Sequence, residues 1–146
     1  DGVTAKRQAL DAAQALSAEA EAAALAAEEA TRQAQLALDA ARLLSDAAGQ
    51  ALDAAWQKAE AVSPEERGRA ALAIAAAKVA TTRASLDVAT RIFDVMGARA
   101  TTARLRLDRF FRNARTHTLH DPVDYKLKEL GEWELSRKLP APSFYS

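Results

Sequence analysis

Apolar and polar positions alternate at helical spacing along the first 62 residues. Ala, Leu, Gln, Glu, Lys and Arg dominate this stretch, and Gly49 is its only internal breaker. At 100° per residue the large apolar side chains fall on two sides: Leu10, Leu25, Leu36 and Leu43 on one, and Leu16, Leu38, Leu52 and Trp56 on the other. The pattern predicts one long helix or two stacked helices over residues 1–62, enclosed between packing partners.

A new helix is predicted over residues 63–97. Ser63 can cap it, Pro64 suits the first helical position, and Glu66 can complete a capping box. Gly97 is suited to the left-handed conformation that ends many helices. Apolar residues recur on two stripes of this helix: Leu72, Val79, Leu86 and Phe93, then Ile74, Val88 and Val95. We therefore expect it to be the central helix of a bundle.

Two shorter helices and a tail complete the predicted fold. Residues 103–116 form an arginine-rich helix, and the cap-plus-proline pair Asp121-Pro122 predicts another over residues 122–135. The proline-containing residues 136–146 are predicted to be an extended tail. The sequence thus predicts an all-α, antiparallel, four-helix-bundle-like fold in a single helical domain over residues 1–146.

Composition agrees with this fold and narrows the functional classes. A chain of 146 residues suits one domain, and 49% apolar with 5% aromatic residues favours long, closely packed helices. The absence of cysteine excludes a thiolate nucleophile and a disulfide framework. No apolar run reaches membrane-spanning length, and the first residues do not resemble a secretion signal. We therefore expect a cytoplasmic protein with no membrane partner.

Charge is distributed unevenly although the formal net charge is zero. Residues 1–62 carry twice as many acidic as basic side chains, and residues 63–146 carry a basic excess. One stretch holds much of this excess around a single acid, Asp108: Arg99, Arg104, Arg106, Arg109, Arg112 and Arg115. A local anion site is the better interpretation. Nucleic-acid binding is disfavoured, since Phe110 and Phe111 fall at core spacing and the net charge is zero.

Two groups of residues carry the candidate chemistry. Gly97, Ala98, Arg99 and Thr101 follow a predicted helix end and resemble a phosphate cradle, with open backbone, a hydroxyl and a planar cationic fork. His117 and His120, the only histidines, lie just before the predicted start of the fourth helix, where an imidazole can exchange a proton near neutral pH. With Asp121 they make only half of a metal site, so we expect no metal.

The sequence resembles the C-terminal helical domain of the acyl-CoA dehydrogenase superfamily. The phrase Arg-Thr-His-Thr-Leu-His-Asp-Pro-Val at residues 115–123 is the most specific part of the resemblance, and Ala-Ala-Ala-Lys-Val at residues 75–79 also fits. The flavin-dependent monooxygenase branch, of the dibenzothiophene monooxygenase-like type, is the most similar. The resemblance covers about residues 32–146, and residues 1–31 show none.

The resemblance implies a flavin site built by this domain together with two further domains. Gly97, Ala98, Arg99 and Thr101 would contact the flavin phosphate, often across a subunit interface. Dehydrogenases of the superfamily carry Tyr-Glu-Gly where this chain has His120, Asp121 and Pro122, so their Glu base is missing. The monooxygenase branch has a His beside the flavin, which His120 matches, with His117 in support. The implied cofactor is FMN, with FAD as the alternative.

From these observations we expect the C-terminal flavin-binding and oligomerisation domain of a flavin-dependent monooxygenase, inactive alone. Its cofactor would bind only together with the missing domains. Expected partners are flavin, a small-molecule substrate and further copies of the chain in a dimer or tetramer. Two alternatives remain open: a purely structural helical bundle or oligomerisation module, and a domain of an acyl-CoA dehydrogenase proper.

Overall fold

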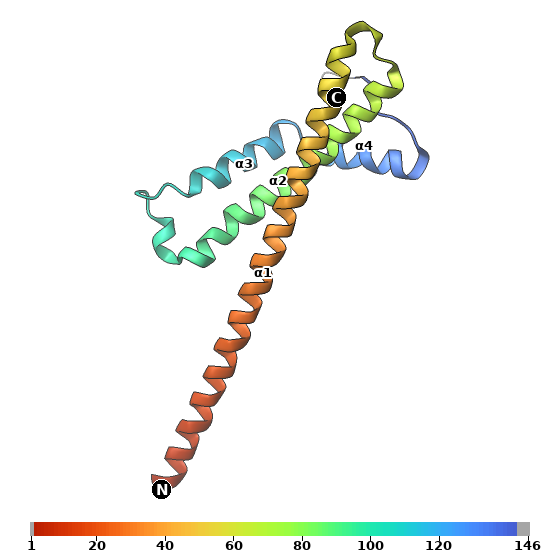
Figure 1. The fold of residues 1–146 in the computed structure, drawn as a ribbon. Helices are drawn as coiled ribbons and strands as arrows, with labels where there is room; N and C mark the ends of the chain where they lie inside the picture. The colour runs from red at the N-terminus through yellow and green to blue at the C-terminus, as the bar shows by residue number, and fades with distance from the viewer. Residues whose placement is uncertain (1, 143–146) are drawn as a thin grey trace. The chain divides into compact units, whose positions relative to one another are not determined.

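A computed structural model describes residues 2–142, and the all-α prediction is confirmed because every regular element in that range is a helix. The chain falls into two compact units, residues 1–35 and 36–146. The first helix, α1 (Gly2–Lys58), contributes residues to both units (Figure 1). No helix within residues 2–142 is apolar over enough of its length to cross a membrane.

The first unit is a run of helix whose side chains are almost all exposed. Leu10, Leu16 and Leu25 are 59%, 67% and 67% exposed. The helical conformation here rests on the high helix propensity of alanine and on local pairs such as Arg32 with Glu29, at 2.8 Å. The leucines of this unit, which the sequence placed between packing partners, are therefore exposed.

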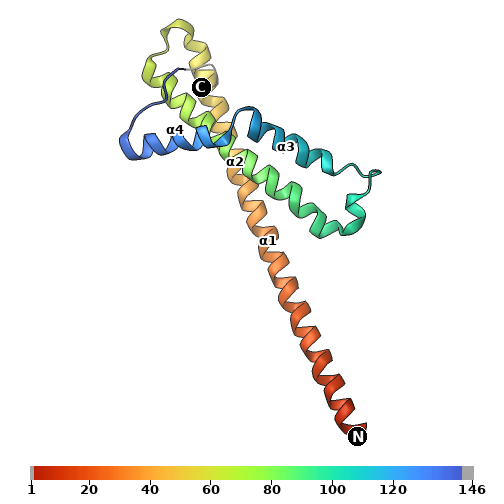
Figure 2. The ribbon, with the colours of Figure 1, turned by 180° about the vertical axis from the view of Figure 1, so that it is seen from behind.

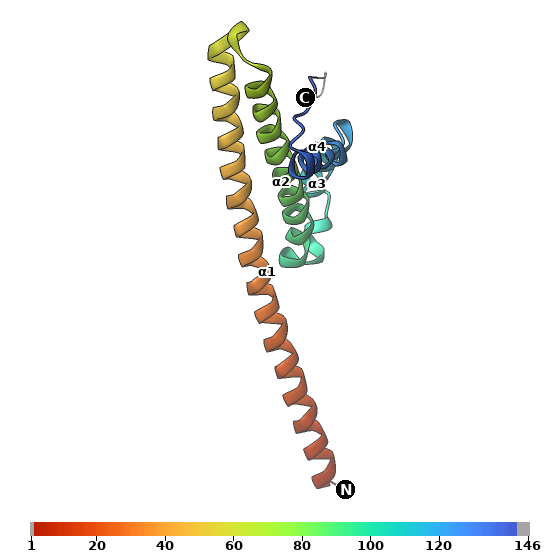
Figure 3. The same cartoon turned by 90° about the vertical axis from the view of Figure 1, so that its right-hand side faces the viewer.

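The second unit is built around α2 (Pro64–Met96). The chain turns at η1 (Ala59–Ala61), so that residues 36–58 of α1 and the following α2 run antiparallel (Figure 3). The elements η2 (Ala98–Thr101), α3 (Asp108–His120) and α4 (Val123–Ser136) all contact α2 (Figures 1 and 2). The buried residues of α2 are mostly small: Gly68, Ala70, Leu72, Ala75, Ala77, Val79, Thr82, Ala84 and Ala89. Small side chains on several sides let α2 serve as the central helix.

The capping box predicted at the start of α2 is confirmed. The Ser63 hydroxyl accepts from the Glu66 backbone N–H at 3.2 Å, and the Glu66 carboxylate accepts from the Ser63 N–H at 3.0 Å. Lys58, at the end of α1, forms an ion pair with the same carboxylate. The turn between α1 and α2 is therefore fixed by one glutamate that satisfies groups on both sides of it.

Acid should weaken this turn through Glu66. The hydrogen bond from Lys58, followed by those from Ser63, lowers the pKa of Glu66 from 4.5 to about 2. A carboxylate with a lowered folded-state pKa stabilises the fold above its unfolded pKa, and this contribution is lost as the pH falls towards the folded value. The wild type should therefore melt above Glu66→Gln by a constant margin at pH 5–7, and that margin should vanish near pH 2. A margin independent of pH in thermal melts would contradict this role.

The third helix lies later in the chain than predicted. We expected residues 103–116, whereas α3 begins at Asp108 and ends at His120. The late start has a backbone cause, because Arg106 adopts a left-handed φ of 52° that no helix interior accepts. The helix then continues because nothing interrupts it before Pro122, which disfavours helical backbone at the residue preceding it. His117 and His120 consequently belong to the last turn of α3.

The fourth helix differs from the prediction at its start. Asp121 was expected to cap it, but the residue preceding α4 is Pro122, and no side chain caps the first turn. The helix passes through Gly131 and continues to Ser136. Arg137 then adopts a left-handed φ of 56°, and residues 138–142 are not helical. The final four residues of the predicted tail lie outside the described part of the chain.

The tail packs back onto the first turns of α2. A methyl group added at Gly68 would lie 2.9 Å from Leu139 Cβ, so glycine permits this close approach. The ring of Trp133 on α4 lies beneath two guanidinium groups, with Arg69 of α2 at 5.8 Å and Arg137 at 5.4 Å from its centroid. These contacts fasten the end of α4 to the start of α2.

Candidate functional site

The predicted phosphate cradle is a short loop at the C-terminal end of α2. Gly97 ends the helix with φ 68° and ψ −170°, a conformation that essentially only glycine adopts, and its N–H donates to the Phe93 carbonyl at 2.8 Å. Ala100 is 1% exposed and fixes η2 against the rest of the unit. The backbone of this loop is therefore held in one shape while Gly97 leaves open space beside it.

Arg99 is the donor of this loop that is available to an anion. Its side chain is exposed, and its guanidinium has no hydrogen bond or ion pair within residues 2–142. Thr101 was expected to donate to an anion, but its hydroxyl donates to the Ala98 carbonyl at 2.8 Å. Thr102 likewise donates to the Arg99 carbonyl at 2.9 Å. Both hydroxyl groups thus donate to carbonyls within the loop. The Arg99 guanidinium is the polar side-chain group of the loop that faces solvent.

Several of the other arginines already have partners within α3. Arg112 pairs with Asp108 at 3.3 Å, Arg109 lies 4.8 Å from the Phe110 ring centroid, and Arg115 donates to the Thr118 hydroxyl at 3.1 Å. Phe110 and Phe111 are 53% and 39% exposed, although their spacing predicted core positions. The arginine-rich stretch is therefore less available to anions than its composition indicates.

The two histidines lie one turn apart at the carbonyl end of α3. Both are exposed, and His120 is the last helical residue. The sequence placed His120 beside the amide end of a following helix, but the later end of α3 puts it at the opposite kind of helix terminus. Thr118, between them in the chain, is 9% exposed and turns the other face of this last turn towards the core. Both imidazoles thus remain accessible to a partner.

Asp121 is held by a lysine that sequence reasoning did not single out. Lys78, near the middle of α2, forms an ion pair with the Asp121 carboxylate, and the two side chains are only 20% and 23% exposed. A lysine in the otherwise small and apolar run Ala75–Val79 was the available signal. The pair fastens the connection between α3 and α4 to α2, and it engages the only carboxylate adjacent to His120 in the chain.

The structure does not bring the two candidate groups together within one chain. Gly97 lies nineteen residues beyond Lys78 on α2, which corresponds to about 28 Å of helix. Lys78 forms an ion pair with Asp121, the residue after His120, so this length of α2 lies between the contact that holds the end of α3 and the Arg99 loop.

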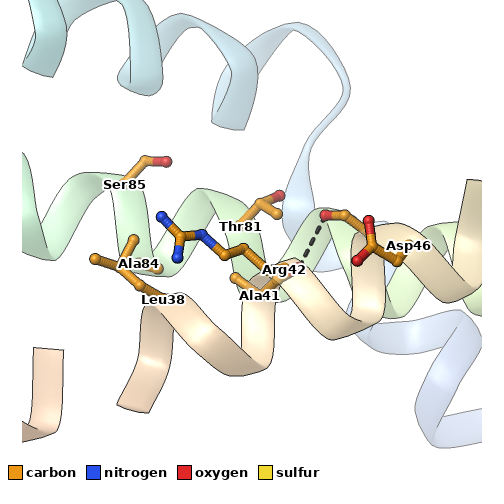
Figure 4. Close-up of a pocket in the computed structure, with 8 residues that line it drawn as sticks. Leu38, Ala41, Arg42, Asp46, Thr81, Ala84 and Ser85 are labelled. Carbon is orange, nitrogen blue, oxygen red and sulfur yellow. Dashed lines mark hydrogen bonds between the residues drawn. The ribbon is translucent and has the colours of Figure 1, made fainter. Parts of the chain in front are cut away.

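Two grooves of the second unit, both within residues 2–142, are lined by residues other than the predicted site residues. A groove of about 380 Å³ lies between α1 and α2, where Leu38 and Ala41 face Thr81 and Ala84 (Figure 4). Another, of about 250 Å³, adjoins the α3–α4 connection: Thr82, Arg83, Leu86, Arg115, Thr118, Leu119, Pro122, Val123 and Asp124. Within residues 2–142, no three His, Asp or Glu side chains are grouped as metal ligands.

Comparison with known proteins places the chain in a family. The sequence profile described as "Acyl-CoA dehydrogenase, C-terminal domain" matches residues 5–125. The match includes most of residues 1–31, for which the sequence resemblance had found no counterpart, and it ends within the first turn of α4. The family profile thus covers both the Arg99 loop and the two histidines.

The similar proteins include flavin-dependent monooxygenases. A probable FMNH2-dependent monooxygenase, SfnC, of Pseudomonas putida is 62% identical over 89 residues, which are 61% of this chain and 22% of that protein. The structure of the methanesulfinate monooxygenase MsuC of Pseudomonas fluorescens matches with a TM-score of 0.73 and 57% identity over 76% of this chain and 29% of that one. The structure of FMN-bound TdsC of Paenibacillus sp. A11-2 matches with a TM-score of 0.55 and 38% identity, over 73% of this chain and 30% of that one.

These matches cover part of this chain and a smaller part of each similar protein. The chain spans about a fifth of the curated relative's length and under a third of the length of the two structural neighbours. The profile match over residues 5–125 includes α2 and α3, the helices that carry the candidate residues. The chain therefore belongs to the family of acyl-CoA dehydrogenase C-terminal domains.

Proposed function

We propose that this chain is the C-terminal domain of a monooxygenase that uses reduced FMN, and that it contributes His120 to one end of the flavin site and Arg99 to the other. The observation that carries the proposal is the exposed His117–His120 turn, held to α2 by the Lys78–Asp121 pair. It occurs in a chain 62% identical over 89 residues to a probable FMNH2-dependent monooxygenase. FAD remains the alternative cofactor.

The residues of the Arg99 loop fit the phosphate end of a flavin mononucleotide. An exposed guanidinium without an acidic partner can bind a phosphate through two parallel hydrogen bonds, and Gly97 leaves room for close approach to the backbone. Ala98 and Thr101 would shape the loop, since the Thr101 hydroxyl is engaged by the Ala98 carbonyl. When bound, a reduced flavin would supply two electrons, so that one atom of dioxygen enters the substrate and the other is reduced to water.

His120 would supply or accept a proton at the flavin ring, with His117 as its neighbour. An exposed imidazole that is neither paired nor buried can serve as a general acid or base when a site closes over it. The upstream domains would provide that closure, together with the substrate pocket. Location in the cytoplasm stays a prediction from the sequence.

We further propose that each flavin site combines two copies of the chain. About 28 Å of α2 lies between Gly97 and Lys78, which holds the residue after His120, so Arg99 of one copy and His120 of another would contact one flavin. Exposed apolar side chains on residues 36–58 support assembly, since Leu36, Leu43 and Trp56 are 58%, 71% and 83% exposed. A homo-oligomer, either a dimer or a tetramer, would bury these residues.

The two alternative functions are less well supported. A dehydrogenase needs a free carboxylate base, but the Asp121 carboxylate is engaged by Lys78. A purely structural bundle leaves the exposed histidine turn and the unpaired Arg99 without a role. The substrate is proposed to be a small sulfur- or nitrogen-containing or aromatic molecule, because one neighbour is a methanesulfinate monooxygenase and another has been solved with indole.

A hybrid protein tests this proposal. The chain would replace the segment that it matches in the Pseudomonas putida relative, and we refer to the product as the hybrid oxygenase. Supplied with reduced FMN, dioxygen and a substrate of that relative, the hybrid oxygenase should form oxygenated product, and the 146-residue chain alone should form none. Turnover by the chain alone, or a folded hybrid that binds FMN and forms no product, would refute the proposal.

A further inference from the structure

The α3–α4 connection has few local means of holding its shape. It consists of Asp121 and Pro122, with Asp121 in an extended conformation at φ −127° and ψ 94°. The start of α4 has no side-chain cap, and the first local bond there joins the Tyr125 N–H to the Pro122 carbonyl at 3.0 Å. Tyr125 is 64% exposed and adds little packing. A distant contact must therefore fix how the end of α3 meets the start of α4.

The Lys78–Asp121 ion pair supplies that distant contact. It joins residues 43 positions apart, and both side chains are largely withdrawn from solvent. A partly buried pair of this kind is geometrically restrictive, because each group has lost most of its hydration and depends on the other. The backbone of Lys78 is itself fixed, since its carbonyl accepts from the Thr82 hydroxyl at 2.6 Å.

His120 lies between two fixed neighbours. Thr118 is buried against the core on one side of it, and Asp121 is anchored to α2 on the other. Several other ion pairs of the unit, such as the exposed pair of Lys128 and Glu132 at 3.8 Å within α4, join two residues of a single helix. Such pairs cannot orient one helix against another.

We propose that Lys78 is a positioning residue for His120: through Asp121 it fixes the α3–α4 connection and so sets the direction in which the imidazole projects. The functional consequence rests on the proposed flavin-dependent function, but the structural claim does not. Removal of the ammonium group frees Asp121 and lets the last turn of α3 rotate or fray. His120 then occupies several positions, whereas the Arg99 loop at the far end of α2 keeps its shape.

The structural arm uses the 146-residue chain and its two histidines, which give two imidazole Hε1 signals in a proton–carbon NMR spectrum. Lys78→Met and Asp121→Asn should each shift and broaden the His120 signal by more than they change the His117 signal. Lys128→Met, which removes an exposed lysine, should leave both signals in place. An unchanged His120 signal in a folded Lys78→Met chain overturns the proposal. If that variant does not fold, the near-isosteric Asp121→Asn decides by the same comparison.

The functional arm uses the hybrid oxygenase. Lys78→Met should lower kcat about 10- to 100-fold, since small displacements of a catalytic group have effects of that size, while the Kd for FMN and the KM for substrate stay within about twofold. Lys78→Arg should restore part of the lost kcat. If His120→Ala leaves kcat unchanged, the proposed function fails whatever Lys78 does. If His120→Ala abolishes turnover and Lys78→Met has no effect on it, only the positioning role fails.

Discussion

Replacing His120 by alanine in the hybrid oxygenase should lower kcat about 100-fold or more, with little change in FMN affinity. A side chain that transfers a proton in the rate-limiting step contributes about 10²- to 10⁴-fold. Alanine keeps the helical backbone of α3, and His120 is exposed, so the substitution removes the imidazole without opening a cavity. Stopped-flow measurement of product formed per reduced flavin consumed would check this expectation.

The matched control for His120 lies on the same helix. Thr116→Ala removes another exposed polar group of α3, whose hydroxyl only donates to the Arg112 carbonyl at 2.9 Å. Its kcat should stay within about twofold of the wild type, since surface changes of this kind have small effects. The kcat of His117→Ala should lie between those of Thr116→Ala and His120→Ala if His117 supports His120. Equal effects of Thr116→Ala and His120→Ala would show that α3 is sensitive to any change and that the imidazole has no special role.

Replacing Arg99 by glutamine should weaken FMN binding by the hybrid oxygenase roughly 10- to 100-fold. A hydrogen bond to a charged group contributes about 1.5–3 kcal/mol, which corresponds to that range of affinity. The change should appear in the Kd measured by flavin fluorescence, while kcat at saturating FMN should remain close to the wild-type value. The effect should decline at high salt, because the guanidinium is exposed.

Arg112 provides the control for Arg99. Arg112→Gln removes the same charge from the same arginine-rich stretch, but Arg112 is already paired with Asp108 on its own helix. Its Kd for FMN should change less than about twofold. If both substitutions weaken binding equally, the stretch attracts the cofactor by general electrostatics, and the specific role of the Arg99 loop is wrong.

Local signals predicted much of the fold. The Ser63-Pro64 start of α2 and its capping box appear as expected, because the groups involved lie within four residues of one another. Gly97 ends the same helix, since its positive φ is a local backbone requirement. Features without a local sequence signal were not predicted. The start of α3 was predicted five residues too early, because nothing in residues 103–107 indicates the left-handed conformation of Arg106.

The candidate site was predicted as a set of residues but not as an arrangement. Periodicity cannot reveal that Asp121 pairs with Lys78, since the two are 43 residues apart and the capping role of Asp121 looked sufficient. Nor does a linear sequence show that the contact holding the end of α3 lies about 28 Å along α2 from the Arg99 loop. The exposed leucines of α1 show the same limit, because spacing predicts an apolar stripe but not whether this chain covers it.

In the proposed function, the turn that ends α3 faces a flavin. A crystal structure of the hybrid oxygenase with FMN bound would show whether it does. We expect an imidazole nitrogen of His120 at about 3 Å from a polar atom of the flavin ring, and Arg99 of a second copy at the phosphate. A bound flavin with His120 directed into solvent, away from the ring in every copy, would contradict it.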